Sequence, residues 1–306
     1  MDRRRGPPRG TRPDIPVLHG DREYHPCVTA VETFHPRRTV LEPPGRWSAL
    51  KLGELWHYRD LLYILAWRDV KVRYKQALLG AAWAVIQPLV MMGIFTLLFS
   101  RIANVPTGGV PYPVFAFVAL VPWTMFASAT AASGSSLVGN QNLVSKVYFP
   151  RLVIPAGTVL AWVPDFLIGS TLLFVIMAVF GFVPPVTAVL LPVVMLSTMA
   201  ASLSVGVWLS ALNVAYRDVQ YVVPFLIQAW LFITPVAYPT ASVPEGLRWL
   251  TGLNPMLWVV DFSRWALLGT TASWGLVLLS VATTALLLVS GLYYFRRVEH
   301  FFADVI

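Results

Sequence analysis

Charged side chains are rare in the apolar part of this sequence, and this limits the chemistry that the chain can perform. Residues 81–295 contain ten charged side chains, and Asp165 is the one acid inside an apolar run long enough to cross a bilayer. Such an acid can couple transport to an ion or a proton, satisfy backbone groups freed by Pro164, or face a subunit interface. The residues alone leave these three interpretations open.

The residues of several common catalytic centres are missing. No histidine lies between His57 and His300, and the single cysteine is Cys27. The apolar region therefore has none of the usual ligands of haem, copper or zinc, and no Ser–His dyad. None of the four lysines follows a glycine, so the G-x-x-x-x-G-K-[ST] phosphate loop is absent. We expect no cofactor or metal here, and an ATP-driven process would need a second chain to hydrolyse ATP.

A basic cluster precedes the apolar region. Within 54–75, Arg68, Lys71 and Lys75 fall on one face at helical spacing. Apolar and aromatic side chains fall on another face: Leu55, Tyr58, Leu62 and Leu65. This pattern predicts an amphipathic helix that lies along the cytoplasmic membrane surface. The alternative is a soluble helix packed on a partner.

Two loops between apolar runs mix apolar and polar residues. In 140–151 a short helix with Lys146 on one face is predicted, and Pro150 ends it. A helix that projects from the inner face suits contact with a cytosolic partner, although a surface connector is the alternative. In 212–220, Arg217 and Asp218 are adjacent and cannot face each other on a helix, so we expect them to bind separate partners.

The elements that position these residues follow from hydropathy. The chain is 57% hydrophobic and 12% charged, against roughly 25% charged in a soluble domain. We therefore predict an all-α membrane protein with six transmembrane helices, because about 20 apolar residues cross a bilayer. The predicted spans are about 81–100, 112–137, 152–180 (interrupted by Pro155 and Pro164), 187–212, 221–239 and 274–295. The apolar stretches of 241–273 are too short to cross, which predicts a re-entrant hairpin or, alternatively, two short extra spans.

The ends of the chain complete the predicted organisation. Residues 1–46 hold nine Arg and eight Pro without an apolar core, which predicts a disordered basic tail and no signal peptide. The interface helix occupies 47–80, the transmembrane domain 81–295 and a cytoplasmic tail 296–306. When only 60–80 of the N-terminal region is counted, the predicted loops on one side of the membrane carry nine Lys and Arg, and those on the other side carry three. Because Lys and Arg are enriched in cytoplasmic loops, both termini are predicted to be cytoplasmic. The basic charge fits a membrane face, and we expect no nucleic acid.

Several sequence stretches, taken in order, resemble the permease subunit of type-2 ABC exporters for polysaccharides. They are LLYILAWRDVKVRYKQ at 61–76, LGAAWAVIQP at 79–88, VPW at 121–123, NLVSKVYFPR at 142–151, LNVAYRDV at 212–219, LNPM at 253–256, and Phe295 with Glu299 and FADVI at 302–306. The resemblance covers about 47–306, and the tail 1–46 has no counterpart in it.

The resemblance implies a homodimer of six-span subunits in the bacterial inner membrane, each with an amphipathic interface helix and an external re-entrant hairpin. Two copies of a cytosolic ABC ATPase, which holds the ATP and Mg, would bind from the cytoplasm. The substrate would be a polysaccharide on a polyprenyl pyrophosphate lipid, such as O-antigen, teichoic acid or another cell-wall glycan. The residues that would contact the ATPase are Asn142, Lys146, Tyr148, Phe149, Arg151, Tyr216, Arg217 and Asp218.

The other two sets of candidate residues concern the substrate. Arg68, Lys71, Arg73 and Lys75 would attract the pyrophosphate of the lipid head group. Because sugars stack on aromatic faces, the candidates for a glycan conduit are Phe115, Trp123, Phe126, Trp162 and Phe166, together with Asp165. An ion- or proton-coupled carrier or a channel that uses Asp165 is the alternative function. A membrane-embedded glycosyltransferase is disfavoured, because the spans lack an acidic cluster.

Overall fold

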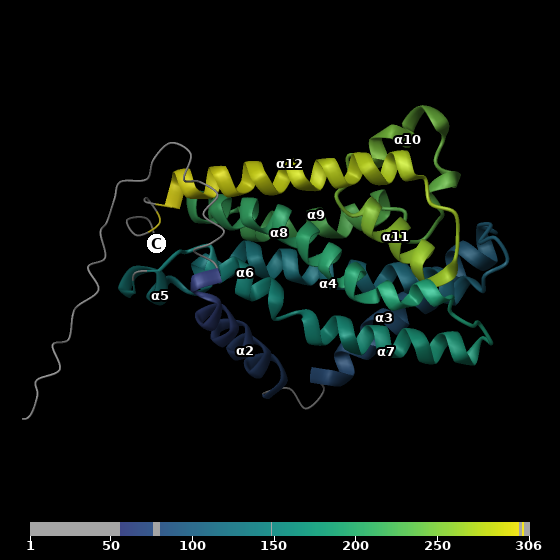
Figure 1. Ribbon diagram of the computed structural model, residues 1–306, viewed down its shortest axis with the longest axis horizontal. Coiled ribbons are helices and arrows are strands. Elements are labelled where there is room, and N and C mark those ends of the chain that lie inside the picture. The colour runs from purple at the N-terminus through teal and green to yellow at the C-terminus, as the bar shows by residue number, and fades with distance from the viewer. Residues whose placement is uncertain (1–55, 76–79, 148, 300–301, 303–306) are drawn as a thin grey trace, which may run out of the picture. The chain divides into compact units, whose positions relative to one another are not determined.

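The computed structural model describes residues 56–75, 80–147, 149–299 and 302. Every described residue belongs to the second of the two units into which the chain divides, Pro44–Ile306. The predicted tail 1–46 and the first part of 47–80 therefore lie outside the described residues. Within the second unit the ordered elements are helices joined by turns (Figure 1).

Five described helical segments are long and apolar enough to cross a membrane. They are α3 (Gly80–Phe95) with a π-helical extension (Thr96–Ile102), α4 (Tyr112–Gly139), the pair α6 (Val153–Leu160) and α7 (Val163–Val179), a 3-10 turn (Val186–Leu190) with α8 (Leu191–Ala215), and α12 (Trp274–Val298). The all-helical membrane fold is thus confirmed, with five of the predicted spans present at their predicted places.

The predicted fifth span is shorter than expected. Its helix, α9 (Val219–Ile233), is apolar and 15 residues long, whereas the prediction extended it to 239. The helix stops because Pro235 follows: a proline disfavours helical backbone at the preceding residue, and Thr234 is indeed extended, at φ −79° and ψ 135°. The count of full-length spans in the described chain is therefore five, with α9 as a sixth apolar helix.

The third span breaks at a place that the prediction did not give. Pro155 and Pro164 both lie in the first turns of their helices, α6 and α7. A proline there removes an N–H that has no partner within the helix, so it does not interrupt the helix. The break lies between them, at Ala161 and Trp162.

Helix α4 forms the centre of the bundle. It packs against α8, α6, α7, α11 (Leu257–Leu268), α3 and α9, and α8 in turn packs against α12 (Figure 1). Small residues allow α4 and α8 to approach closely: a Cβ atom placed on Gly206 of α8 would lie 2.5 Å from the Ser133 hydroxyl of α4. The buried side chains of α4, among them Phe117, Leu120 and Phe126, form the main hydrophobic core.

Two short helices occupy the region predicted to be re-entrant, α10 (Glu245–Thr251) and α11 (Leu257–Leu268). At about 1.5 Å per residue, neither approaches the roughly 30 Å of a bilayer core. The alternative of two extra spans is therefore wrong, and the re-entrant path stays a prediction.

Buried polar contacts hold α11 in place. Arg264, which is 3% exposed, donates from Nη2 to the Val236 carbonyl at 2.7 Å and from Nη1 to the Tyr238 carbonyl at 3.2 Å. Its guanidinium lies 3.9 Å from the ring centroid of Phe115 on α4. The buried carboxylate of Asp261 accepts a hydrogen bond from Thr240 at 2.8 Å. These contacts fix α11 to the turn after α9 and to α4.

The predicted helix 54–75 is described from residue 56, and its main part is α2 (Arg59–Lys75). The described residues of its predicted apolar stripe contact protein: Leu65 is buried, and Tyr58 and Leu62 pack on the same core. Leu55 lies outside the described residues. The exposed apolar side chains of α2 are Tyr63, Ile64, Trp67 and Val72.

Candidate functional site

Arg73 of α2 and Asp165 of α7 form an ion pair beside the break between α6 and α7. Arg73 Nη1 lies 2.8 Å from Asp165 Oδ2, and the same nitrogen donates to the Ala161 carbonyl at 3.0 Å. The guanidinium also lies 3.5 Å from the ring centroid of Trp162. Because the two side chains are 25% and 17% exposed, the pair is largely shielded from solvent. The pair thus fastens α2 to the helix break.

This junction gives Asp165 a partner within the same subunit. The carboxylate lies in the first turn of α7, where the helix dipole favours a negative charge. The broken helix leaves the Ala161 carbonyl without its intrahelical donor, and Arg73 supplies a hydrogen bond to it. Asp165 is therefore the partner of an arginine 92 residues earlier in the chain, a contact that the sequence did not predict, and the three interpretations stay predictions.

Tyr74 lies next to this pair. Burial and the neighbouring Asp165 carboxylate raise the pKa of Tyr74 to about 12, so the phenol keeps its proton at physiological pH. A neutral phenol adds no charge to the junction.

The four basic residues predicted to bind pyrophosphate do not form one cluster. Arg68 contacts Asp69 at 2.8 Å and donates to the Asn140 side chain at 2.8 Å, which ties α2 to the end of α4. Lys71 and Lys75 are exposed, and Lys71 lies 5.5 Å from the Trp67 ring. The assignment of Arg73 to the pyrophosphate stays a prediction, and its guanidinium is engaged with Asp165 and Trp162.

A groove on α2 gathers the other three basic residues. Its volume is about 500 Å³, and the residues that line it are Ile64, Trp67, Arg68, Lys71, Val72 and Lys75. Cationic nitrogens beside exposed apolar side chains suit an anionic lipid head group at a membrane surface.

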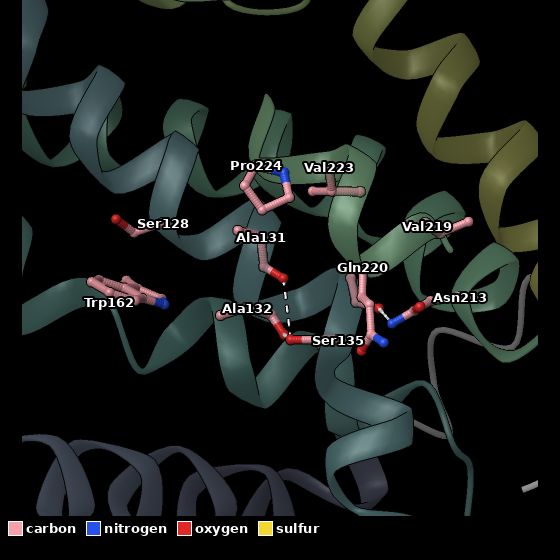
Figure 2. A pocket seen from close by; sticks show the side chains of 11 residues that line it. Ser128, Ala131, Ala132, Ser135, Trp162, Asn213, Val219, Gln220, Val223 and Pro224 are labelled. Atoms are coloured by element: carbon pink, nitrogen blue, oxygen red, sulfur yellow. Dashed lines mark hydrogen bonds between the residues drawn. The ribbon is translucent and has the colours of Figure 1, made fainter. Parts of the chain in front are cut away.

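A second cavity, of about 410 Å³, lies between α4, α9 and the helix break (Figure 2). Trp162 stands at one edge, with Gln220 and Asn213 toward the other (Figure 2). Small residues of α4 complete the wall: Ser128, Ala131, Ala132, Gly134 and Ser135. Trp162 Nε1 is buried and has no hydrogen-bond partner among the described residues. The cavity therefore joins an aromatic face to a few amide and hydroxyl groups.

The other predicted conduit aromatics are buried. Phe115, Trp123, Phe126 and Phe166 are 4% exposed or less and belong to the main core. The Phe126 ring, for example, packs edge-on to Trp230 with centroids 5.4 Å apart. In this conformation these four rings are enclosed by their own subunit, and their assignment to a conduit stays a prediction. Trp162 differs from them because it lines a cavity.

The predicted projecting helix is present as α5 (Gln141–Lys146). Asn142 and Lys146 are exposed on it, whereas Val144 is buried beneath. The candidate residues Phe149 and Arg151, further along the loop, are less exposed. Phe149 is buried, and Arg151 donates its backbone N–H to the Glu299 carboxylate at 3.0 Å. Tyr148 lies outside the described residues.

The second loop leaves its polar residues at the surface. Tyr216, Arg217 and Asp218 are exposed, and α9 begins directly afterwards at Val219. Together with Asn142 and Lys146, they are the exposed members of the predicted ATPase contact.

Sequence reasoning missed the partners of several of these residues. The contacts of Arg264 and the Arg151–Glu299 contact were not predicted, although the charges in 241–273 and the Glu299 motif were noticed. The signal for Arg264 was its spacing from Asp261, since a cation and an acid in a short apolar segment need buried partners.

Comparison with known proteins agrees with this architecture. Residues 60–268 match the family described as ABC-2 type transporter. The O-antigen export system permease protein RfbA of Myxococcus xanthus is 35% identical over 208 residues, which cover 67% of this chain and 78% of that protein. The RfbA protein of Klebsiella pneumoniae is 29% identical, with 81% of this chain and 95% of that protein covered. The polysialic acid transport protein KpsM of Escherichia coli is 27% identical, with 76% and 91% covered. The family match spans more than half of a chain that folds as a bundle of apolar helices, and this chain belongs to the ABC-2 type transporter family.

Proposed function

We propose that this chain is the transmembrane subunit of an ATP-driven exporter of a polysaccharide carried on polyprenyl pyrophosphate, such as O-antigen or a similar cell-envelope glycan. The observation that carries the proposal is the similarity to permeases named for O-antigen and polysialic acid transport, over most of the chain. The proposal places the chain in the bacterial inner membrane with both termini cytoplasmic, as the distribution of Lys and Arg predicts.

The proposed complex contains two copies of this chain and two copies of a cytosolic ABC ATPase. The exposed face of α9 is the candidate surface for contact with the second copy. It carries the exposed apolar residues Tyr221, Val222, Phe225, Leu226, Phe232 and Ile233, which suit a second subunit or lipid. ATP and Mg would be held by the ATPase.

In the proposed mechanism, ATP binding draws the two ATPase subunits together and moves the loops that contain α5. The lipid pyrophosphate would first meet Lys71 and Lys75 in the groove of α2. The attached sugars would then pass the cavity at Trp162, whose ring and neighbouring amides suit a hydroxylated polymer. Movement between subunits would open the path further, and the chain itself performs no chemical step.

The alternative, an ion- or proton-coupled carrier that uses Asp165, loses its main support. Asp165 is held by Arg73 at 2.8 Å, in a pair that is largely shielded from solvent. A proton-coupling acid must instead release and rebind its proton during each cycle. The pair favours a role in fastening α2 to α7.

The test of the proposed function is co-purification with the ABC ATPase encoded nearest to this chain's gene. The complex, reconstituted in lipid, is expected to hydrolyse ATP faster when lipid-linked glycan is added. A chain that transports without any ATPase, and stops doing so after Asp165→Asn, would support the carrier instead.

Reversing the charge of Lys146 is expected to weaken assembly with the ATPase about tenfold, since an exposed charge on α5 would then oppose its partner. The measurement is the affinity of the ATPase for Lys146→Glu permease in detergent. Arg101→Glu is the matched control, because Arg101 is also exposed but belongs to the predicted opposite side. Equal affinities for the two variants would contradict the contact at α5.

Replacing Trp162 with alanine is expected to lower the export rate at least about fivefold, a loss typical of one stacking contact. The assay is glycan export into vesicles at a fixed ATPase content. Because Trp162 also contacts Arg73, Trp162→Phe serves as the control that keeps an aromatic ring beside the guanidinium. If both variants export at the wild-type rate, the cavity is not on the glycan path.

A further inference from the structure

We infer that Glu299 and Phe302, at the end of the chain, are positioning residues that connect the ATPase-contact loop to α12. The inference rests on the proposed function, because that function gives α5 its contact with the ATPase. It assigns a role in energy coupling to the C-terminal segment, which lies far from α5 in the sequence. Figure 1 shows that α5 and the C-terminal end of α12 lie at the same end of the bundle.

Glu299 contacts the loop and α12 at the same time. Its Oε1 atom accepts the backbone N–H of Arg151 at 3.0 Å, and its Oε2 atom lies 3.1 Å from Arg296 Nη1, one turn earlier in the chain. The Arg151 guanidinium donates to the Glu299 backbone carbonyl. One carboxylate therefore joins the residue that follows Pro150 to the last turn of α12.

Phe302 adds an apolar contact beside this bridge. Its side chain is fully buried and packs edge-on to Phe295 of α12, with ring centroids 5.3 Å apart. The Arg151 guanidinium lies 6.0 Å from the Phe302 ring. Phe302 belongs to a second hydrophobic core that also contains Val144 of α5 and Phe149. Helix α5, through Val144, and the loop after it, through Phe149, are thus packed on the same core as Phe302.

These contacts change the route by which a displacement of α5 reaches the membrane. Along the chain, the neighbours of α5 are α4 and α6. The second core and the Glu299 bridge add α12, and α12 packs along α8. Because packed interiors resist deformation, a shift of α5 must carry the end of α12 with it or break these contacts. We therefore expect α12 to move with the loop when the ATPase closes.

The test compares Glu299→Ala and Phe302→Ala with Arg297→Ala, which removes an exposed charge from the same turn of α12. Each permease is reconstituted with its ATPase, and complex formation, ATP hydrolysis and glycan exported per ATP are measured. In the variants that fold, complex formation and ATP hydrolysis are expected to stay within about twofold of wild type, because neither residue belongs to the predicted ATPase contact. Glycan exported per ATP is expected to fall about fivefold or more in the two test variants, the effect of losing a hydrogen bond to a charged group or a buried ring.

Glu299→Gln keeps an acceptor for the Arg151 N–H but loses the charge that faces Arg296, so an intermediate loss of coupling is expected. If either alanine variant does not fold, the near-isosteric Glu299→Gln variant tests the inference in its place. Normal export per ATP in the folded variants would overturn the inference while leaving the proposed function intact. Failure of the wild-type chain to bind an ATPase would overturn both.

Discussion

Arg264→Met is expected to destabilise the folded permease by about 3–5 kcal/mol, the range measured when one member of a buried charged network is removed. The variant leaves the Val236 and Tyr238 carbonyls without their donor. It also removes the cation that lies over Phe115 and leaves the buried Asp261 without a neighbouring positive charge. Arg264→Lys is expected to recover only part of the loss, since an ammonium group does not reproduce the planar, forked donors of a guanidinium.

The measurement is the free energy of unfolding in detergent, with the thermal midpoint as a second reading. Arg248→Met is the matched control, because Arg248 also donates to backbone carbonyls, those of Val243 and Ala241, but lies nearer the surface. A loss of no more than about 1 kcal/mol is expected for it. Asp261→Asn added to Arg264→Met should restore some stability by removing the uncompensated acid. Equal stability of Arg264→Met and the wild type would contradict the role of Arg264 in fixing α11.

Removing either member of the Arg73–Asp165 pair is the second change with a large expected effect. Arg73→Met and Asp165→Asn are each expected to lower the free energy of unfolding by about 2 kcal/mol, the scale of a shielded hydrogen bond between charged groups. Arg73→Met is expected to lower the free energy of unfolding more than Asp165→Asn does, because Arg73 also binds the Ala161 carbonyl and stacks on Trp162. The double variant is expected to cost less than the sum of the single ones, with a coupling energy of about 1 kcal/mol or more.

A double-mutant cycle on the unfolding free energy measures that coupling. The pair Arg59–Asp60, 3.8 Å apart with side chains 63% and 91% exposed, is the control, and its coupling is expected to be close to zero. Additive losses for Arg73 and Asp165 would show that the pair does not fasten α2 to α7. The same variants test the carrier alternative, because a carrier would lose transport in Asp165→Asn even where the protein remains fully folded.

Hydropathy was sufficient to place the membrane-spanning helices, because a bilayer demands long apolar segments and few other structures meet that demand. It extended α9 too far, since Val236 and Ala237 are apolar but follow the proline that ends the helix. The proline set the end of α9, and average hydropathy does not report the effect of a proline on the backbone.

It was less predictable which side chains of a helix are buried in the protein and which are exposed. Phe126 and Phe225 both lie in apolar helices, yet Phe126 is fully buried and Phe225 is 70% exposed. In a bilayer, lipid and protein core are equally apolar, so residue type does not separate them. The long-range pairs were beyond a single sequence for a different reason. Arg73 and Asp165 are 92 positions apart, and Arg151 and Glu299 are 148 apart, so only the folded topology brings them together.

The enclosure of α4 has a consequence for how the protein is made. In its most apolar stretch 78% of the residues are buried, against 39% or less in the other four described spans. Its buried hydroxyl side chains, such as Thr130 and Ser133, must nevertheless pass through lipid when the ribosome has delivered α4 but not yet α8 or α11. Nascent α4 therefore depends on helices synthesised later to replace its lipid neighbours. A chain cut short before α8 should consequently leave α4 in the membrane as a substrate for quality-control proteases.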